Sequence, residues 1–216
     1  MLTFVEEILL LMLDDQDGRL VDLPRSAMNG VIAGAVLMDL AMHDRIDSDL
    51  QELRVVDKTP TGDPLLDTTL ASLSAAKDGR NSSAWVEEVA RDADDLREKA
   101  LARLVSRGIL RKEEGRFLWV FHTRRYPVID DREQREVKAR LRELVLGTEI
   151  PDPRDVVLVC LVEASGLWDL VLTEAEQEKA ADRIAQLRKM DLVGQAMTQV
   201  VRDIQESIAV ASTMAW

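Results

Sequence analysis

The sequence has 216 residues, of which 46% are hydrophobic and 31% are charged, and its formal net charge is −12. This hydrophobic content is enough for a sizeable buried core and excludes a wholly disordered chain. Broad adhesion to nucleic acid or to an anionic membrane requires positive charge, which the chain as a whole does not supply. Nucleic acid is therefore not an expected partner.

The cysteine content and the apolar runs predict a cytoplasmic location. Cys160 is the single cysteine, which excludes an internal disulfide framework and is typical of a reducing compartment. Residues 156–162 form the longest uninterrupted apolar run, far shorter than a membrane span requires. Glu6 and Glu7 interrupt the apolar N-terminus, so we expect no secretory signal there. Membrane attachment, where it occurs, is expected to be peripheral.

Two helices are predicted in the N-terminal part. Residues 3–13 are dense in apolar residues, with Thr3 as the N-cap and Glu6 completing a capping box. The acidic turn DDQDG ends this helix and is interpreted as a plain turn, because a calcium loop would need other residue types in its ligand positions. Residues 24–42 predict a second helix, whose alanines and glycines favour close packing in the core.

A short hairpin is predicted next, from the runs at 45–47 and 53–56. The following stretch, residues 57–70 (DKTPTGDPLLDTTL), contains a Thr-Gly-Asp triplet that could bind a phosphate at a helix N-terminus. Asp63 is well placed as an N-cap and Pro64 as the first helical residue. We therefore interpret this stretch chiefly as the beginning of a helix.

The second half repeats the order of helix and hairpin. Residues 94–110 predict an amphipathic helix that ends at Gly108, and strands at 109–112 and 116–121 flank a Glu-Glu-Gly turn. After Pro127, helices are expected near 130–146, 153–170 and 173–212, the last broken near 191–194. The predicted fold class is mainly α: a single compact helical domain over residues 1–216 with one or two short β-hairpins.

Positive charge is concentrated in residues 97–125, where nine Lys and Arg residues face three acids, giving +6 against −18 for the remainder. Basic residues beside aromatic ones suit an anionic membrane interface. The partner expected from this segment is an anionic membrane lipid. The candidate lipid-binding residues are Arg97, Arg103, Arg107, Arg124 and Arg125.

The hairpin at 109–126 is the candidate contact with a membrane, a protein partner or another copy of the chain. Strand alternation places three aromatic residues on one face and two aliphatic residues on the other, so both faces are apolar. An uncovered apolar face usually marks an interaction surface. The alternative is that these residues are ordinary core and the arginines pair with the abundant acids. The candidate contact residues are Phe117, Leu118, Trp119, Val120 and Phe121.

Motifs for catalysis, nucleotide binding or metal binding are missing from the sequence. It contains no G-x-S-x-G, H-E-x-x-H, G-x-G-x-x-G or Walker motif. His43 and His122 with one cysteine cannot build a usual zinc site. Cys160 lies in an apolar run and is expected to be buried and inert. We expect no catalysis, no metal and no cofactor.

Four stretches, at residues 2–20, 60–67, 96–127 and 157–172, resemble the Golgi phosphoprotein 3 family in their order and spacing. The resemblance covers essentially the whole chain. It implies a single, mostly helical domain without catalysis. It also implies the properties of the family's eukaryotic members, which bind phosphatidylinositol 4-phosphate, sit peripherally on Golgi membranes and hold the cytosolic tails of glycosyltransferases. We expect this chain to be a bacterial relative.

The resemblance also implies where a lipid pocket would lie. The family's pocket uses a tryptophan after the first helix, an arginine in the second helix, and two arginines one turn apart before the hairpin. In this sequence these positions fall at Leu23 or Pro24, Ala33, Asp94 and Arg97. Only Arg97 is retained, so the resemblance implies a degenerate pocket that tolerates different anionic headgroups.

Two other classes of function remain open at this point. The repeated helix and hairpin are typical of winged-helix modules, which makes a DNA-binding regulator the main alternative. The net charge and the lack of a basic recognition helix at 24–42 disfavour it. An enzyme without a recognised motif is the second alternative.

Overall fold

The computed structural model describes residues 1–14, 17–48, 53–76, 82–117 and 121–189, and it is mainly helical, as predicted. The helices of the described residues are α1 (Phe4–Met12), α2 (Arg25–Met42), α3 (Pro64–Ala75), α4 (Ser82–Ala90), α5 (Ala93–Ser106), α6 (Arg132–Leu146), α7 (Pro153–Ser165), the short 3₁₀ helix η1 (Trp168–Leu170) and α8 (Glu174–Leu187). Two antiparallel pairs of strands accompany them, β1 (Ile46–Ser48) with β2 (Leu53–Val55) and β3 (Glu113–Phe117) with β4 (Phe121–Arg125).

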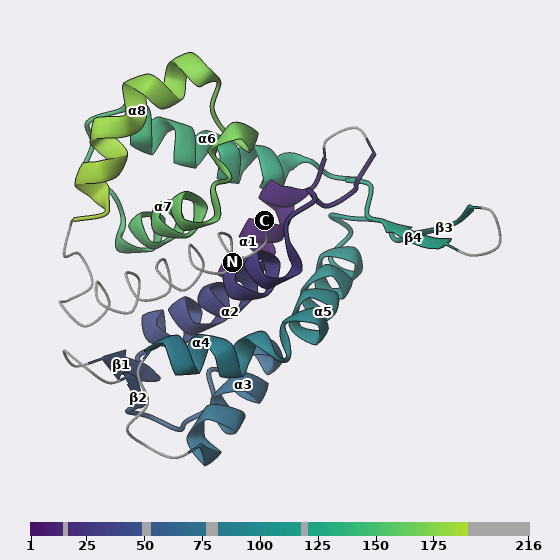
Figure 1. The fold of residues 1–216 in the computed structure, drawn as a ribbon, viewed down its shortest axis with the longest axis vertical. Helices are drawn as coiled ribbons and strands as arrows, with labels where there is room; N and C mark the ends of the chain where they lie inside the picture. The colour runs from purple at the N-terminus through teal and green to yellow at the C-terminus, as the bar shows by residue number, and fades with distance from the viewer. Residues whose placement is uncertain (15–16, 49–52, 77–81, 118–120, 190–216) are drawn as a thin grey trace.

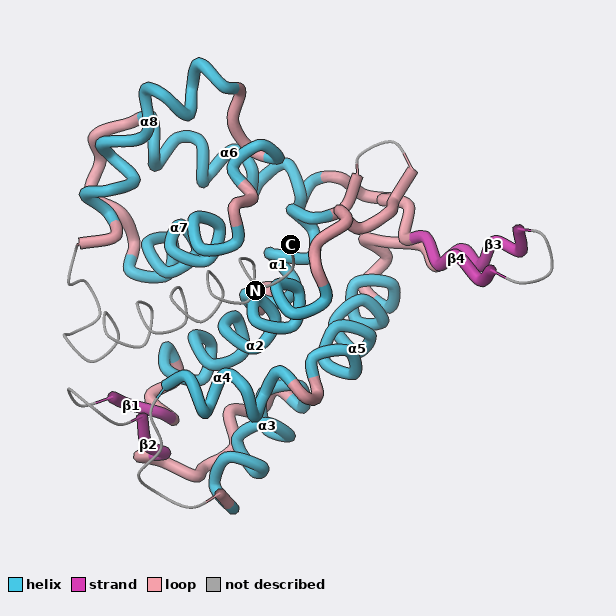
Figure 2. Tube along the Cα trace, in the orientation of Figure 1, coloured by secondary structure: helices cyan, strands magenta, loops and turns pink. Residues whose placement is uncertain are grey.

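Helices α1 and α2 form the centre of the helical body (Figures 1 and 2). All nine residues of α1 are buried, and its predicted capping box between Thr3 and Glu6 is confirmed. Helix α2 contacts α1, α3, α4, α5 and α7, and its buried small residues, such as Ala33 and Gly34, permit this close packing. Helices α3 to α5 lie on one side of the central pair and α6 to α8 on the other (Figure 1).

Among the described residues, three carboxylate side chains lie inside this core: Glu6, Glu7 and Asp39. Glu7 Oε1 accepts from Arg140 at 2.5 Å, and Oε2 accepts from Arg154 at 3.0 Å. Arg154 also donates to Asp39 at 3.2 Å, and the other Asp39 oxygen accepts from the Phe4 N–H at 2.7 Å. Because buried charges are costly unless paired, these contacts fix α1 against α2, α6 and α7.

The hairpin predicted at 109–126 exists, but its predicted turn is wrong. Glu-Glu-Gly lies within β3, and Glu113 pairs with Arg125 and Phe117 with Phe121. The bridge between Leu110 and Val128 continues the same register toward the body. Leu110 and the neighbouring Tyr126 are buried, so the core fixes the register at the base of the hairpin, and the ladder continues to the pair of Phe117 with Phe121.

Other boundaries are confirmed or corrected. The hairpin of β1 and β2 lies where it was predicted. Helix α7 ends at Ser165 rather than 170, because Gly166 adopts a left-handed conformation at φ 64° and closes the helix. Helix α4 was not predicted from the sequence. The predicted helix at 173–212 corresponds to α8, and its predicted break and C-terminal part lie outside the described residues.

Cys160 on α7 is buried, as predicted, and burial raises the pKa of its thiol to about 11. Among the helices that the structure describes, none combines the length and apolar character that crossing a membrane requires.

Candidate functional site

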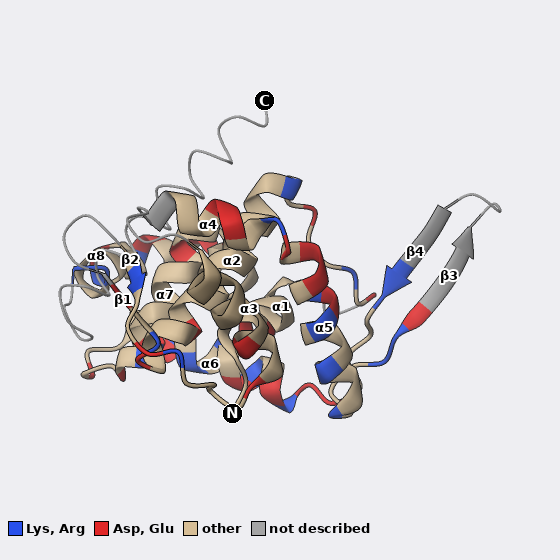
Figure 3. Ribbon diagram, turned by 90° about the horizontal axis from the view of Figure 1, so that it is seen from below, with Lys and Arg blue, Asp and Glu red and all other residues tan. Residues whose placement is uncertain are grey.

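Three candidate arginines precede the hairpin: Arg97 and Arg103 on helix α5 and Arg107 at its C-cap. They fall into two groups. Arg97 faces a hollow beside the base of the hairpin, whereas Arg103 lines a different hollow beside α3. Figure 3 shows basic segments on α5 and on β4, next to the point where the hairpin leaves the helical body. The two hollows therefore have to be considered separately.

Arg103 and Arg107 reach the interior of the protein. Arg103 Nη2 lies 3.3 Å from Glu6 Oε2, and Arg107 Nη1 lies 3.9 Å from the same oxygen. Glu6 has no exposed side-chain surface. Arg107 also lies 3.7 Å from Glu133 on α6. The two guanidinium groups supply the charge that the buried Glu6 needs, and they connect α1 with α5 and α6.

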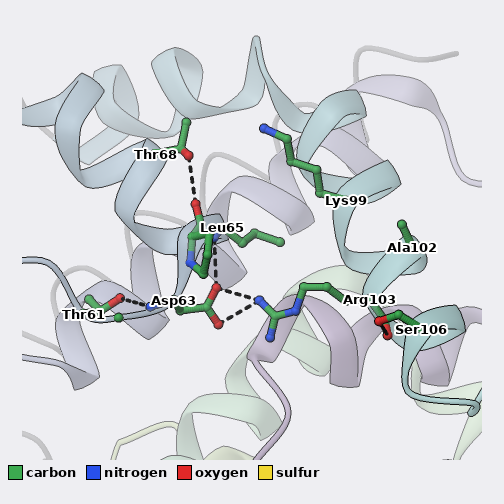
Figure 4. A pocket seen from close by; sticks show the side chains of 10 residues that line it. Thr61, Asp63, Leu65, Thr68, Lys99, Ala102, Arg103 and Ser106 are labelled. Atoms are coloured by element: carbon green, nitrogen blue, oxygen red, sulfur yellow. Dashed lines mark hydrogen bonds and ion pairs between the residues drawn. The ribbon is translucent and has the colours of Figure 1, made fainter.

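The hollow beside α3 has a volume of about 790 Å³ and is lined by the loop at 61–63 and by α5 (Figure 4). Asp63 caps α3 by accepting from the Leu65 N–H at 2.9 Å, which confirms the predicted helix start. Its two oxygens also accept from Arg103 at 2.6 and 2.8 Å. Lys99 pairs with Asp95 at 2.7 Å. Both cations of this hollow thus have carboxylate partners within the chain.

The second hollow has a volume of about 320 Å³ and collects arginines from three separate segments. Arg19 comes from the turn after α1, Arg97 from α5 and Arg124 from β4. Its remaining lining residues are Leu20, Glu98, Leu101 and Tyr126. A hollow with three guanidinium groups against one carboxylate, together with two aliphatic side chains and a phenol, is suited to an anionic group attached to an apolar body. We call it the arginine hollow.

The turn after α1 reaches the arginine hollow because Gly18 packs against the chain at Tyr126 and Pro127. Gly18 has φ 66°, and a Cβ atom there would lie 2.4 Å from the Pro127 nitrogen. The Tyr126 N–H donates to the Gly18 carbonyl at 2.7 Å. Only glycine permits this backbone approach, which holds Arg19 beside the base of the hairpin.

Each arginine of the hollow also has an acidic neighbour. Arg124 pairs with Glu98, which ties β4 to α5. Arg19 lies 3.1 Å from Asp17, and Arg97 lies 2.8 Å from Asp94. These side chains are partly exposed, so their ion pairs are weak and can exchange with another anion at small cost.

The four positions of the family's lipid pocket have different environments here. Ala33 is fully buried in the centre of α2, and Pro24 is exposed while Leu23 is half-buried. Asp94 and Arg97 lie in the first turns of α5 and contact each other. The retained Arg97 therefore faces the arginine hollow together with Arg19 and Arg124, which are not among the four family positions.

The hairpin formed by β3 and β4 projects away from the helical body (Figures 1 and 3). Arg125 lies on β4, opposite Glu113 in the ladder. The predicted contact residues Leu118, Trp119 and Val120 lie outside the described residues. For Phe117 and Phe121 the structure describes the backbone pairing alone.

Arg19 and Tyr126 were not predicted as members of the hollow. A local signal for Arg19 was present, because it directly follows the tight acidic turn that ends in Gly18. Tyr126 adjoins the predicted Arg124 and Arg125. Their convergence depends on contacts between residues more than 100 positions apart, as between Gly18 and Tyr126, which no local pattern encodes.

Comparison with known proteins adds two findings. A family model described as Golgi phosphoprotein 3 (GPP34) matches residues 4–204. Vacuolar protein sorting-associated protein 74 of Eremothecium gossypii is 24% identical over 212 residues, in an alignment that covers 82% of this chain and 63% of that protein. The chain thus spans less than two thirds of the length of this relative.

Proposed function

Because this chain belongs to the Golgi phosphoprotein 3 family, we propose that it is a non-enzymatic adaptor that attaches peripherally to a membrane by binding anionic lipid. The arginine hollow takes the lipid headgroup, and the hairpin beside it contacts the bilayer or a protein partner. The protein works in the cytoplasm and on the membrane surface that faces it. Phosphatidylinositol 4-phosphate is one accepted headgroup among several.

The convergence of Arg19, Arg97 and Arg124 on one hollow at the base of the projecting hairpin is the observation that carries this proposal. A basic residue near an anionic membrane contributes about 1 kcal/mol to binding. The three guanidinium groups bring together hydrogen-bond donors that an anionic headgroup can use in exchange for their partly exposed carboxylate partners. Arg125 lies next to Arg124 on the same strand.

The composition of the hollow supports tolerance toward headgroups. A selective phosphate site usually has two guanidinium groups that bind the same group bidentately without competition. Here each arginine already contacts a carboxylate, and Ala33 supplies no charge at the family's second-helix position. Binding is then governed by charge density more than by the position of a phosphate on the headgroup.

The hairpin remains the proposed contact with the bilayer, with a protein partner or with a second copy of the chain. Its sequence at 117–121 is FLWVF, and basic residues flank it on both sides. Its projection from the body leaves room for such a contact (Figure 3). In a membrane the flanking arginines would lie at the level of the phosphates, and aromatic residues are enriched at that depth.

The DNA-binding alternative finds no support in the fold. Fourteen of the eighteen residues of α2, the helix that would read DNA, are buried in the centre of the helical body. A recognition helix has to be exposed to enter a groove.

The test is sedimentation with vesicles of neutral lipid alone and with vesicles that also contain phosphatidylserine. We expect binding only to the anionic vesicles, weakened by salt, and about 25-fold weaker for the double variant Arg97→Gln/Arg124→Gln, since each charge contributes about 1 kcal/mol. Arg91→Gln is the matched control, because Arg91 is an exposed arginine outside the hollow. Equal binding of the double variant and the control would contradict the proposal.

Two further arms resolve the details. Vesicles with phosphatidylinositol 4-phosphate should bind the protein no more than about threefold better than phosphatidylserine vesicles of equal surface charge, and a stronger preference would contradict headgroup tolerance.

The hairpin is tested by Leu118→Ser/Val120→Ser, which should leave the thermal unfolding temperature unchanged and lower vesicle binding or oligomer size. Loss of folding, or no effect in either assay, would show that the hairpin is not an interaction surface.

A further inference from the structure

The carboxylate of Asp94 lies between two arginines that come from different helices. Its Oδ2 accepts from Arg25 Nη2 at 2.5 Å, and its Oδ1 lies 2.8 Å from Arg97 Nη2. Arg25 is the first residue of α2, whereas Asp94 and Arg97 lie in the first turns of α5. Each oxygen of the Asp94 carboxylate thus contacts a different guanidinium group, that of Arg25 or that of Arg97.

This arrangement is that of an anion-binding site whose ligand is part of the chain. Two guanidinium groups that converge on one anion are the usual way to hold a carboxylate or a phosphate with charge-assisted hydrogen bonds. The hydrogen bond from Arg25 lowers the pKa of Asp94, so the carboxylate is ionised at neutral pH. Arg97 is also a lining residue of the arginine hollow.

We propose that Asp94 is a specificity-determining residue, an internal anion that holds Arg25 and Arg97 and so keeps a phosphomonoester from being preferred where these two arginines meet, beside the arginine hollow that Arg97 lines. This inference rests on the proposed function of that hollow. It assigns a role to Asp94 and Arg25, neither of which lines the hollow.

The reason lies in the charge of the competing ligands. A phosphomonoester carries close to two negative charges at pH 7, whereas the headgroup of phosphatidylserine carries a net charge of one. Repulsion from the ionised Asp94 is therefore larger for the phosphomonoester. With Asp94 neutralised, both guanidinium groups become available to one phosphate, and the phosphomonoester gains more than the singly charged headgroup.

The solvent exposure of these side chains argues against a purely structural role for their ion pairs. The side chains of Arg25, Asp94 and Arg97 are 79%, 42% and 24% exposed. Ion pairs this exposed contribute little to the stability of a fold. The arrangement can therefore be altered without unfolding the protein, and its two arginines can be offered to a ligand.

The experiment compares Asp94→Asn with Asp95→Asn, its neighbour on α5, which removes the same charge from an exposed pair with Lys99. Binding is measured to vesicles of equal surface charge that contain phosphatidic acid or phosphatidylserine. Asp95→Asn should raise both affinities by a similar factor of at most about five. Asp94→Asn should raise the phosphatidic acid affinity by a further factor of about ten over that for phosphatidylserine.

The double variant Arg25→Gln/Asp94→Asn tests the mechanism directly. It should lose the added preference for phosphatidic acid, because one of the two released guanidinium groups is missing. Titration of Asp94→Asn with inorganic phosphate shows whether the released site also takes free phosphate or requires a lipid. Saturable binding of inorganic phosphate that Arg25→Gln/Asp94→Asn lacks would support the released pair as the phosphate site.

The inference is overturned if Asp94→Asn and Asp95→Asn show the same ratio of phosphatidic acid to phosphatidylserine binding, or if the ratio of Asp94→Asn survives the loss of Arg25. A drop in unfolding temperature of Asp94→Asn well beyond that of Asp95→Asn would overturn it too, since Asp94 would then be structural. Folded wild type that binds no anionic vesicle contradicts the proposed function. If the wild type binds no anionic vesicle but Asp94→Asn binds vesicles that contain phosphatidic acid, the role inferred for Asp94 is still supported.

Discussion

Glu7 and Asp94 are each held between two arginines, one in the interior of the helical body and the other at its surface. The partners of Glu7 are Arg140 and Arg154, at 2.5 and 3.0 Å, and those of Asp94 are Arg25 and Arg97, at 2.5 and 2.8 Å. The side chain of Glu7 is 4% exposed, whereas that of Asp94 is 42% exposed. The bonding is nearly the same in both regions, and burial decides what each arrangement can do.

In the interior, removing one partner leaves an unpaired charge that water cannot reach, so the carboxylate and its arginines act together as a structural unit. At the surface, water and salt replace a lost partner, so the same groups can bind and release an external anion. This difference separates the charges that hold α1 in place from those proposed to meet a lipid.

The largest expected effect comes from Glu7→Gln. The substitution removes the buried carboxylate that Arg140 and Arg154 share, leaving Arg140 with Asp155 and Arg154 with Asp39. We expect the free energy of unfolding to fall by about 3–5 kcal/mol. Chemical denaturation measures it, with Glu143→Gln on the exposed face of α6 as the control. A loss below about 1 kcal/mol would mean that burial does not distinguish the two regions.

A pH-dependent effect is expected from Asp39, the second buried carboxylate of this network. Burial raises the pKa of Asp39 to about 6, although Arg154, the Phe4 N–H and His43 oppose the rise. The folded protein therefore binds this proton more tightly than the unfolded chain does. The contribution of protonated Asp39 to the free energy of unfolding is fully present below pH 3.8, the pKa in the unfolded chain. It is lost as the pH rises through about 6, the pKa in the folded protein.

The variant Asp39→Asn removes this titration while keeping an oxygen that can accept from Arg154 or from the Phe4 N–H. The stability of wild type relative to the variant should fall by up to about 3 kcal/mol between pH 4 and pH 7 and stay constant above that. Denaturation curves of both proteins at matched pH values measure it. A difference that rises with pH would show that Asp39 is stabilised in its charged form.

The parts of the fold that the sequence predicted correctly depend on local signals. The capping box of Thr3 and Glu6 and the helix start at Asp63 and Pro64 each lie within one helical turn. The register of the β3–β4 hairpin was not predictable in this way, because it is set by the burial of Leu110 and Tyr126 at its base, whereas the sequence offered a plausible turn at Glu-Glu-Gly.

The candidate site was predicted in part for a similar reason. The basic segment was evident from charge counting, but the sequence could not show which arginines meet buried acids. Arg103 reaches Glu6 across 97 positions, and Arg19 joins Arg97 and Arg124 only through the close approach at Gly18. A pattern of charges predicts a basic surface, and tertiary contacts decide which of its members remain available.

The smallest expected effect, and the sharpest contrast with Glu7→Gln, comes from Arg25→Gln. Arg25 is 79% exposed, so the loss of its ion pair with Asp94 should cost less than about 0.5 kcal/mol. Arg25 also stands at the N-terminus of α2, where the helix dipole disfavours a cation, so removing its charge offsets part of that cost. We expect an unfolding free energy within about 0.5 kcal/mol of wild type, at low salt and at about 0.5 M salt alike. Arg154→Gln, which removes an arginine that is 16% exposed, is the interior counterpart and should lose several times more. If Arg25→Gln lost as much as Arg154→Gln, the surface pair would be part of the scaffold, and neither Arg25 nor Arg97 could be released to a ligand without unfolding the end of α5.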